Sequence, residues 1–300
     1  MKFSIITPVY NGEKYITETI ESVLSQEGDF EIEYIIQDGG STDQTIEIVK
    51  KYDELLKRGS YPTQCNKVTL QWVSEKDAGM YDAINRGFAR ATGDIFAYIN
   101  ADDIYLLGAF EAIHKTFETF PEIKWLKGIT SFVKDEGGIY QHGKCYIYNQ
   151  KWIQMGVYGR DTFFIQQDSV FWKKELWTKV GGIDSRLKLA GDYFLWIQFA
   201  KHYPLWSLNK EVSCFRKHSG QLSENINLYK KEQEIIIQNK SILRLFIRLF
   251  FSLNARSPQW LNKYFNLIYQ VAFSNENPYC IEITQKKIPI KRLVHTYTLF

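Results

Sequence analysis

The chain has 300 residues, of which 45% are hydrophobic, 24% charged and 16% aromatic, with a formal net charge of +3. This composition is typical of a folded globular protein, and so small a charge argues against a nucleic-acid partner. The four cysteines lack metal or disulfide spacing, and no apolar stretch reaches the roughly 18 residues that cross a bilayer, so we expect a cytoplasmic protein that is soluble or lies on a membrane.

The first third of the chain alternates between strand and helix patterns. Short apolar runs predict strands at residues 3–9, 33–37, 68–73 and 95–99. Helical periodicity follows the first three runs, at residues 16–24, after a capping box formed by Ser41 and Gln44, and at residues 80–91. This order predicts an α/β fold with a mostly parallel sheet covered by helices on both faces.

The remainder of the chain has a less regular pattern. Residues 125–173 are rich in strand formers with a hairpin signal at 135–138, a helix is predicted at 192–201, and a strand at 211–217. The pattern is mainly helical from Ser223 onward and includes a long apolar run at 242–251. We therefore predict a first domain at residues 1–222 and a helical C-terminal extension at residues 223–300.

Polar residues follow all four predicted strands of the first third. They are Pro8-Val9-Tyr10-Asn11, Gln37-Asp38-Gly39, Ser74-Glu75-Lys76-Asp77 and Asn100-Ala101-Asp102-Asp103. Each group alone is typical of a surface turn or a helix cap. Ligands bind beyond the carboxyl ends of parallel strands, so together these groups indicate one binding crevice.

Two of these groups carry specific chemistry. Adjacent carboxylates such as Asp102 and Asp103 repel each other unless water or a cation separates them, and carboxylate oxygens suit Mg²⁺ or Mn²⁺. Asp38 precedes two glycines that let the backbone approach a ligand, so its carboxylate is a candidate acceptor for the imide N–H of a uracil. Tyr10 offers a flat face for a base.

In order and spacing these segments resemble the motifs of family 2 glycosyltransferases. The resemblance is dense over residues 3–104, where it also includes Asp38-Gly39-Gly40-Ser41-Thr42-Asp43 and residues 74–85, and continues thinly to about Ser223. It implies a GT-A fold and inverting transfer of a sugar from a UDP- or dTDP-linked donor to a hydroxyl. It also implies a Mn²⁺ or Mg²⁺ cofactor and an acceptor that is a bacterial surface glycan or a lipid-linked glycan.

The resemblance also implies roles for particular residues. Those expected to bind the nucleotide sugar are Pro8, Tyr10, Asn11, Asp38, Asp77, Tyr81, Asp82, Asn85 and Asp102. The expected metal ligands are Asp102, Asp103 and His218, with Asp102 favoured within the aspartate pair. Asp192 is the expected catalytic base, although the chain has Gly191 and Phe194 where the family frequently has acidic residues.

Two other classes of protein are considered. A non-catalytic sugar-nucleotide-binding protein would keep Asp38 and tolerate loss of Asp192. A nucleotidyltransferase would carry a glycine-rich, arginine-containing loop after the first strand, and Pro8-Val9-Tyr10-Asn11-Gly12 lacks that signature.

The C-terminal helices suggest a contact surface. Arg244 and Arg248 stand four residues apart in an apolar helix, and Trp260, Tyr264 and Tyr269 follow. Such a helix can lie in the interface of a membrane, with its arginines near anionic headgroups. We therefore expect peripheral contact with the inner face of the cell membrane, or a homodimer formed through the same apolar stripe.

Overall fold

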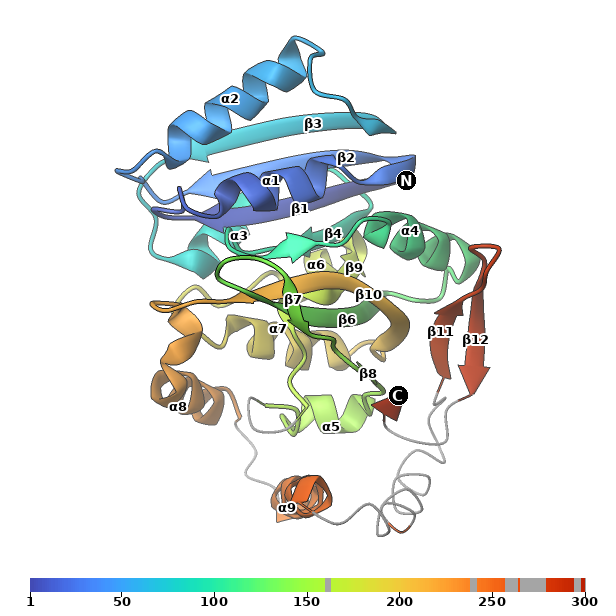
Figure 1. Ribbon diagram of the computed structural model, residues 1–300. Coiled ribbons are helices and arrows are strands. Elements are labelled where there is room, and N and C mark those ends of the chain that lie inside the picture. Colours follow the sequence, from blue (N-terminus) through green and yellow to red (C-terminus); the bar gives the residue numbers. More distant parts are fainter. Residues whose placement is uncertain (160–162, 238–241, 257–263, 265–278, 294–297, 300) are drawn as a thin grey trace.

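The computed structural model describes residues 1–159, 163–237, 242–256, 264, 279–293 and 298–299. Its centre is an eleven-stranded mixed sheet with helices on both faces (Figure 1). Along the main path the strand order is β12-β11-β10-β6-β9-β4-β1-β2-β3.

The first third forms the parallel half of this sheet. Strands β1 (Lys2–Val9), β2 (Glu27–Asp38), β3 (Gln64–Ser74) and β4 (Ile95–Tyr98) lie in parallel in the order β4-β1-β2-β3. The connecting helices are α1 (Ile16–Leu24), α2 (Thr45–Lys57) and α3 (Met80–Arg90). The predicted α/β class and the mostly parallel sheet are confirmed.

Alternating side chains of β1 belong to two hydrophobic cores. Ile5 packs in the core that contains α1, part of α2 and helix α4 (Ala109–Thr119). Its neighbour Ile6 packs in the core that contains α3, helix α6 (Lys174–Val180) and helix α7 (Gly191–Ala200). This is the two-residue period of a strand that is covered on both faces. Much of the aromatic excess fills the second core, which includes Trp125, Trp172 and Trp196.

The other half of the sheet mixes directions. Strand β9 (Val170–Lys173) runs antiparallel to both β4 and β6 (Trp125–Lys134), and β10 (Trp206–Lys217) runs parallel to β6. The hairpin predicted at 135–138 joins β6 to β7 (Ile139–Gln141) and is confirmed. The smaller elements are β5 (Ile104–Tyr105), β8 (Cys145–Tyr146), α5 (Gln150–Gln154) and the 3-10 turns η1 (Gln167–Ser169) and η2 (Leu222–Glu224).

The C-terminal extension contains the predicted helices and additional strands. Its helices are α8 (Ile226–Ile236) and α9 (Ile242–Arg256). Strand β11 (Tyr279–Ile283) joins β10 in parallel, with β12 (Pro289–Leu293) beside it, while β13 (Thr298–Leu299) pairs with β8. These strands were missed by the sequence analysis. Strand β11 belongs to the same sheet as the first domain. The domain boundary at residue 222 therefore stays a prediction.

The predicted contact surface is only partly described. Trp260 and Tyr269 lie outside the described residues. No helix in the described part of the chain is long and apolar enough to span a bilayer. Arg244 donates from Nε to the carbonyl of Gly156 at 3.2 Å, so it faces the protein body instead of an outer surface. Contact of α9 with a membrane or with a second copy of the chain stays a prediction.

The predicted capping box at the start of α2 is also wrong. The helix begins at Thr45 after Gln44, and no side chain caps it in the expected way. Asp43 holds this end instead, accepting the Thr45 backbone N–H at 3.0 Å.

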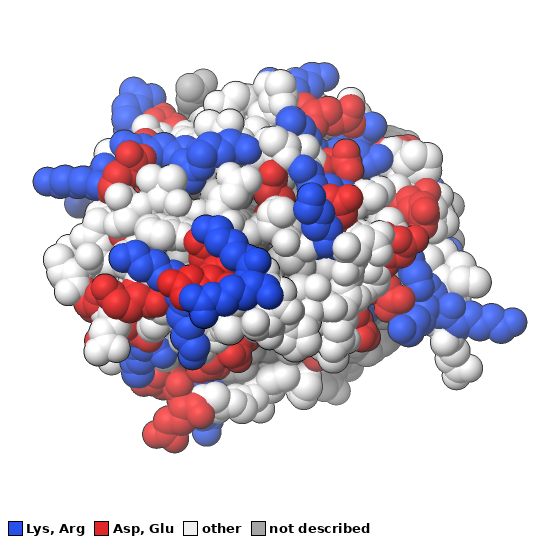
Figure 2. All heavy atoms as spheres, turned by 90° about the horizontal axis from the view of Figure 1, so that it is seen from above, with Lys and Arg blue, Asp and Glu red and all other residues white. Residues whose placement is uncertain are grey.

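Figure 2, a view onto the α2 end of the molecule, shows basic and acidic side chains interspersed on this face. Helix α2 itself carries the ion pairs Lys57–Asp53 and Arg58–Glu54.

Candidate active site

The carboxyl ends of β1, β2, β4 and β10 border a cleft of about 1710 Å³, with α7 and α8 on its far side. Eight of the residues predicted from the sequence line it: Pro8, Tyr10, Asn11, Asp77, Tyr81, Asp102, Asp192 and His218. The cleft thus gathers segments from residues 8 to 229 of the chain. The other four predicted residues, Asp38, Asp82, Asn85 and Asp103, do not line the cleft.

The turn after β1 presents an exposed aromatic ring. Tyr10 is 65% exposed, and Asn11 adopts a φ of 50°, a left-handed conformation that asparagine tolerates well. Asn11 accepts the Thr42 N–H at 2.9 Å through Oδ1 and donates its own N–H to Ser41 Oγ at 2.7 Å. These bonds fix one wall of the cleft and leave the Tyr10 ring open.

Asp38 organises the neighbouring turn. It is fully buried, and its Oδ2 accepts the N–H groups of Gly40 and Ser41 at 3.0 and 2.9 Å. Ser74 Oγ donates to the same oxygen at 2.6 Å. The carboxylate therefore holds the turn that presents Gly39 and Gly40 to the cleft, and contact of Asp38 with the base stays a prediction.

Asp77 lies where the Gly39 turn meets the start of α3. Its Oδ1 accepts the Gly79 N–H at 2.8 Å, and a Cβ placed on Gly39 would lie 2.9 Å from its Oδ2. That distance is shorter than normal van der Waals contact, so only glycine fits beside the carboxylate. The two residues together form a tight acidic edge of the cleft.

The remaining polar residues of α3 serve the fold. Asp82 accepts the Ala78 N–H at 3.0 Å and pairs with Arg86 at 2.8 Å. Asn85 makes two bonds to the backbone of Ile183, at 2.7 and 3.0 Å. Neither side chain lines the cleft, and both fix the loops beside it. Donor binding by Asp82 and Asn85 stays a prediction.

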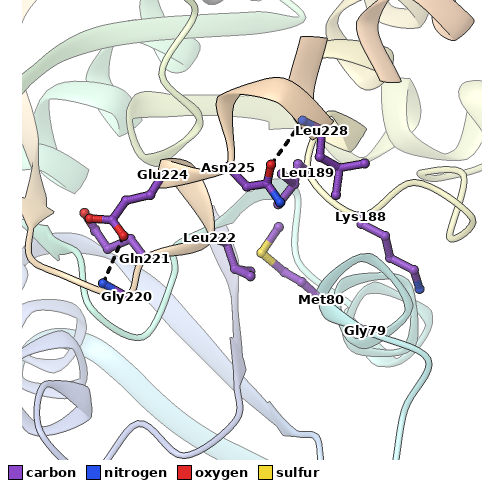
Figure 3. Close-up of a pocket in the computed structure, with 10 residues that line it drawn as sticks. All are labelled: Gly79, Met80, Lys188, Leu189, Gly220, Gln221, Leu222, Glu224, Asn225 and Leu228. Carbon is purple, nitrogen blue, oxygen red and sulfur yellow. Dashed lines mark hydrogen bonds between the residues drawn. The ribbon is translucent and has the colours of Figure 1, made fainter. Parts of the chain in front are cut away.

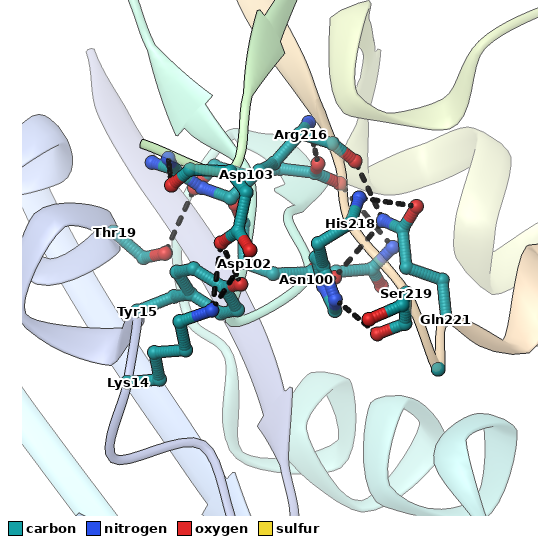
Figure 4. Close-up of polar contacts among 12 residues, drawn as sticks. Lys14, Tyr15, Thr19, Asn100, Asp102, Asp103, Arg216, His218, Ser219 and Gln221 are labelled. Atoms are coloured by element: carbon teal, nitrogen blue, oxygen red, sulfur yellow. Dashed lines mark hydrogen bonds and ion pairs between the residues drawn. The ribbon is translucent and has the colours of Figure 1, made fainter. Parts of the chain in front are cut away.

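Asp102 and His218 face each other across the cleft floor (Figure 4). His218 Nε2 lies 3.0 Å from Asp102 Oδ2, and the two side chains are 15% and 26% exposed. Gln221 braces the pair: its Oε1 accepts the His218 N–H at 3.1 Å and its Nε2 donates to the Arg216 carbonyl at 2.6 Å. The pair is thus a rigid, partly open cluster of oxygen and nitrogen ligands.

The chemistry of this pair fits a divalent cation. His218 Nδ1 lies 2.8 Å from the Ser219 carbonyl, which only accepts, so Nδ1 carries the proton. The lone pair of a neutral Nε2 then points at a carboxylate oxygen, an unfavourable contact unless a proton or cation lies between them. Within the described residues no third His, Cys, Asp or Glu completes a metal cluster. Mg²⁺ typically uses one or two protein carboxylates plus substrate phosphates, so a two-residue site suits it.

Asp103 does not belong to this pair. It is fully buried, and its Oδ1 accepts the Arg216 N–H at 2.9 Å. Burial raises the pKa of Asp103 well above its usual range, and the charges of Asp102 and Asp168 add to the rise. The carboxyl group of Asp103 does not line the cleft, and metal binding by Asp103 stays a prediction.

Arg216 is a residue that the sequence analysis did not assign. It is 1% exposed, and its guanidinium donates to the Asp102 carbonyl at 3.0 Å and to Glu18 Oε2 at 2.6 Å. It also donates to the carbonyls of Lys134 and Asp135 in the β6–β7 turn. Arg216 therefore fixes the backbone of Asp102. The sequence signal that could have identified this role was a basic residue two positions before His218.

Asp192 lies in the first turn of α7 and lines the cleft while being 5% exposed. Its Oδ1 accepts the Tyr193 N–H at 2.7 Å and the Tyr229 hydroxyl at 3.2 Å. A carboxylate at the N-terminus of a helix is stabilised by the helix dipole. Two other aspartates of this region are engaged elsewhere: Asp168 is fully buried and bonded to Ser213 at 2.5 Å, and Asp184 is paired with Arg186.

Neighbouring residues explain why the chain has glycine before Asp192. A Cβ on Gly191 would lie 2.6 Å from the Tyr81 ring. That ring lines the cleft, and its hydroxyl donates to the Leu189 carbonyl at 2.7 Å. Tyr81 therefore packs directly on the backbone that presents Asp192.

Comparison with known proteins identifies relatives of this architecture. The sequence model of glycosyl transferase family 2 matches residues 4–172. An uncharacterised glycosyltransferase of Nostoc is 32% identical over 119 residues, which are 40% of this chain and 34% of that protein. The poly(ribitol-phosphate) β-N-acetylglucosaminyltransferase TarS of Staphylococcus aureus is 35% identical over 106 residues, 34% of this chain and 16% of TarS. The match thus spans about a third or less of these relatives.

Solved structures share the fold over most of the chain. TarS 1–349 in complex with UDP-GlcNAc has a TM-score of 0.59 at 17% identity, covering 91% of this chain and 81% of that one. The mannosyltransferase PcManGT of Pyrobaculum calidifontis, in complex with GDP-Man and Mn²⁺, has a TM-score of 0.56 at 15% identity, covering 92% and 81%. At such identities the likeness concerns the fold, and it extends beyond the segment that the family model matches.

Proposed function

This chain belongs to glycosyl transferase family 2 and is a glycosyltransferase, and from that premise we propose that it moves a sugar from a UDP-linked donor to an acceptor hydroxyl with inversion. The observation that carries the proposal is the single cleft that joins the Tyr10 ring, the Asp102–His218 pair and Asp192. These are the groups needed to hold a base, a diphosphate and a reacting hydroxyl.

The donor half of the proposal concerns the ends of β1 and β4. We assign the base to the exposed face of Tyr10 and to the Gly39 turn, and the diphosphate to Asp102 and His218. Mn²⁺ or Mg²⁺ held by these two residues would supply Lewis-acid neutralisation of the leaving phosphates. Lys76 and Lys217 also line the cleft and offer further positive charge. The likeness to structures that hold UDP-GlcNAc, or GDP-Man with Mn²⁺, supports this assignment.

The acceptor half concerns Asp192. Its carboxylate lies at the N-terminal turn of α7 and takes the proton of the acceptor hydroxyl as that oxygen attacks the anomeric carbon and the bond to the diphosphate breaks. A positioned base contributes about 10²–10⁴-fold to such a step. One base and one displacement invert the configuration of the sugar.

The acceptor is proposed to be a bacterial surface glycan or a lipid-linked glycan. TarS is named for transfer to poly(ribitol-phosphate), and a further relative in Bacillus subtilis is named a minor teichoic acid biosynthesis protein. Both names describe those proteins, and their shared theme supports the acceptor class here. The four cysteines are free thiols, which supports a reducing, cytoplasmic location.

The test is a screen of nucleotide sugars with and without Mn²⁺, in which the released product is identified. The proposal predicts release of UDP that depends on the cation. Release of pyrophosphate would favour a nucleotidyltransferase. Binding of a nucleotide sugar with no turnover on any glycan acceptor would favour a non-catalytic binding protein.

A further inference from the structure

Helices α7 and α8 both lie beyond residues 4–172, which match the family model, and α8 contacts the N-terminal end of α7. Tyr229 of α8 is 4% exposed and donates its hydroxyl to Asp192 Oδ1 at 3.2 Å. Burial raises the pKa of Tyr229 well above its usual range, and the charge of Asp192 adds to this. The phenol therefore keeps its proton at neutral pH and serves as a hydrogen-bond donor.

One turn further along α8, Glu232 holds the backbone that leads into α7. It is 6% exposed and accepts the N–H groups of Lys188, Leu189 and Ala190, each at 2.8 Å. The first N–H groups of a helix lack partners within it, and an anion beside them is favourable. Glu232 thus fastens the segment immediately before Asp192 with three charged hydrogen bonds.

The start of α8 is itself fixed against the cleft. Asn225 caps the helix by accepting the Leu228 N–H at 3.1 Å, and Glu224 accepts the Gly220 N–H at 3.1 Å (Figure 3). A second hollow of about 670 Å³ lies here, lined by Met80, Leu189 and the segment that follows His218, and it shares several residues with the main cleft. The short segment between His218 and α8 therefore connects the Asp102–His218 pair to the residues that contact Asp192.

We propose that Tyr229 and Glu232 are positioning residues for Asp192, so that α8 completes the catalytic site from outside the matched segment. The inference rests on the proposed function, because it assumes that Asp192 is the base. Tyr229 orients the carboxylate and stabilises its charged form. Glu232 fixes the backbone from which the carboxylate projects.

Among the described residues, the ionisable groups near Asp192 are mostly phenols. Tyr81 of α3, Tyr98 of β4 and Tyr229 of α8 all have pKa values raised by burial and then by the charge of Asp192. Glu232 adds a negative charge on the α8 side. Loss of the Tyr229 hydroxyl removes a donor to the carboxylate, so the pKa of Asp192 rises and catalysis is lost at a higher pH as the solution is acidified.

The first test is Tyr229→Phe in the full chain, with Tyr61→Phe as the matched control. A hydrogen bond to a charged group contributes enough to predict a fall in kcat of about tenfold or more, with the KM for the donor unchanged. The acid limb of the pH profile should move upward, and the control should behave as wild type. An unchanged kcat and an unchanged acid limb in Tyr229→Phe would overturn the inference while leaving the transferase function intact.

A second measurement does not depend on turnover. The Asp192 carboxyl resonance, assigned with Asp192→Asn, is titrated by ¹³C NMR in wild type and in Tyr229→Phe. A higher pKa in the variant is expected, and equal values would refute the contact even if the wild type transfers no sugar.

The third variant, Glu232→Gln, has Glu234→Gln as its control, since Glu234 is an exposed glutamate of the same helix. We expect kcat to fall in Glu232→Gln while UDP affinity is retained, and the control to match wild type. Loss of UDP affinity in parallel with kcat would indicate a merely structural role for Glu232 and contradict the inference.

Discussion

Replacement of Asp192 by asparagine isolates the chemical step from donor binding. The substitution keeps the shape of the side chain. It also retains an oxygen that can accept from the Tyr193 N–H and the Tyr229 hydroxyl, which lie 2.7 and 3.2 Å from Asp192 Oδ1 in the wild type. The local structure should therefore survive. What is lost is the ability to accept a proton from the acceptor hydroxyl.

The size of the effect follows from the role of a base. Loss of general-base catalysis costs about 10²–10⁴ in kcat, which corresponds to roughly 3–5 kcal/mol in the barrier. Because the donor is held by the opposite side of the cleft, the affinity for UDP should change by less than about twofold, as expected for an interaction made only in the transition state.

The assay measures UDP release at saturating donor and acceptor, with UDP affinity determined by calorimetry on the same preparation. Near-normal turnover in Asp192→Asn would refute the assignment. The buried Asp168 and the paired Asp184 are poor substitutes, so such a result would place the base at a residue other than these three aspartates. A parallel loss of turnover and UDP affinity would show instead that Asp192 supports the donor site.

Three other predictions concern binding. EDTA should abolish UDP release, and added Mn²⁺ should restore it. Asp102→Asn or His218→Ala should raise the Mn²⁺ concentration required for activity, whereas substitution of an exposed histidine, His142→Ala, should not. Full activity in the presence of chelator would contradict the metal site. Gly39→Ala places a Cβ 2.9 Å from Asp77 Oδ2, and overpacking of about 1–3 kcal/mol predicts UDP binding weaker by roughly tenfold or more; unchanged calorimetric affinity would refute this. The exposed apolar side chains of α9, including Phe246, predict sedimentation with anionic vesicles at low salt, whereas a chain that stays in the supernatant and scatters light as a dimer would support the homodimer.

The sequence predicted the parallel half of the sheet because its strands are short, apolar and separated by periodic helices. It also predicted the cleft, since the carboxyl ends of parallel strands must meet at one edge. Strand β12 pairs only with β11. Strand β11 was missed because its other partner, β10, is distant in the sequence, with Ser207 paired to Cys280. A local pattern carries no information about such a partner.

Several of the predicted site residues do not line the cleft, and the physical reason is the same for each. Asp38, Asn85 and Asp103 have the residue types that bind ligands, but each is used to satisfy backbone N–H or C=O groups beside the cleft. Which aspartate of a pair faces the cleft depends on tertiary packing. The buried Arg216 determines this by donating to the Asp102 carbonyl through its side chain and to the Asp103 carboxylate through its backbone N–H.

The proposed reaction is one displacement at the anomeric carbon with Asp192 as the base. Proton NMR of the product formed from an α-linked UDP-sugar reads this directly, since the anomeric coupling distinguishes an α-glycoside from a β-glycoside. We predict a β-glycoside, and we predict that its formation is slowed in Asp192→Asn. An α-glycoside would contradict the single displacement.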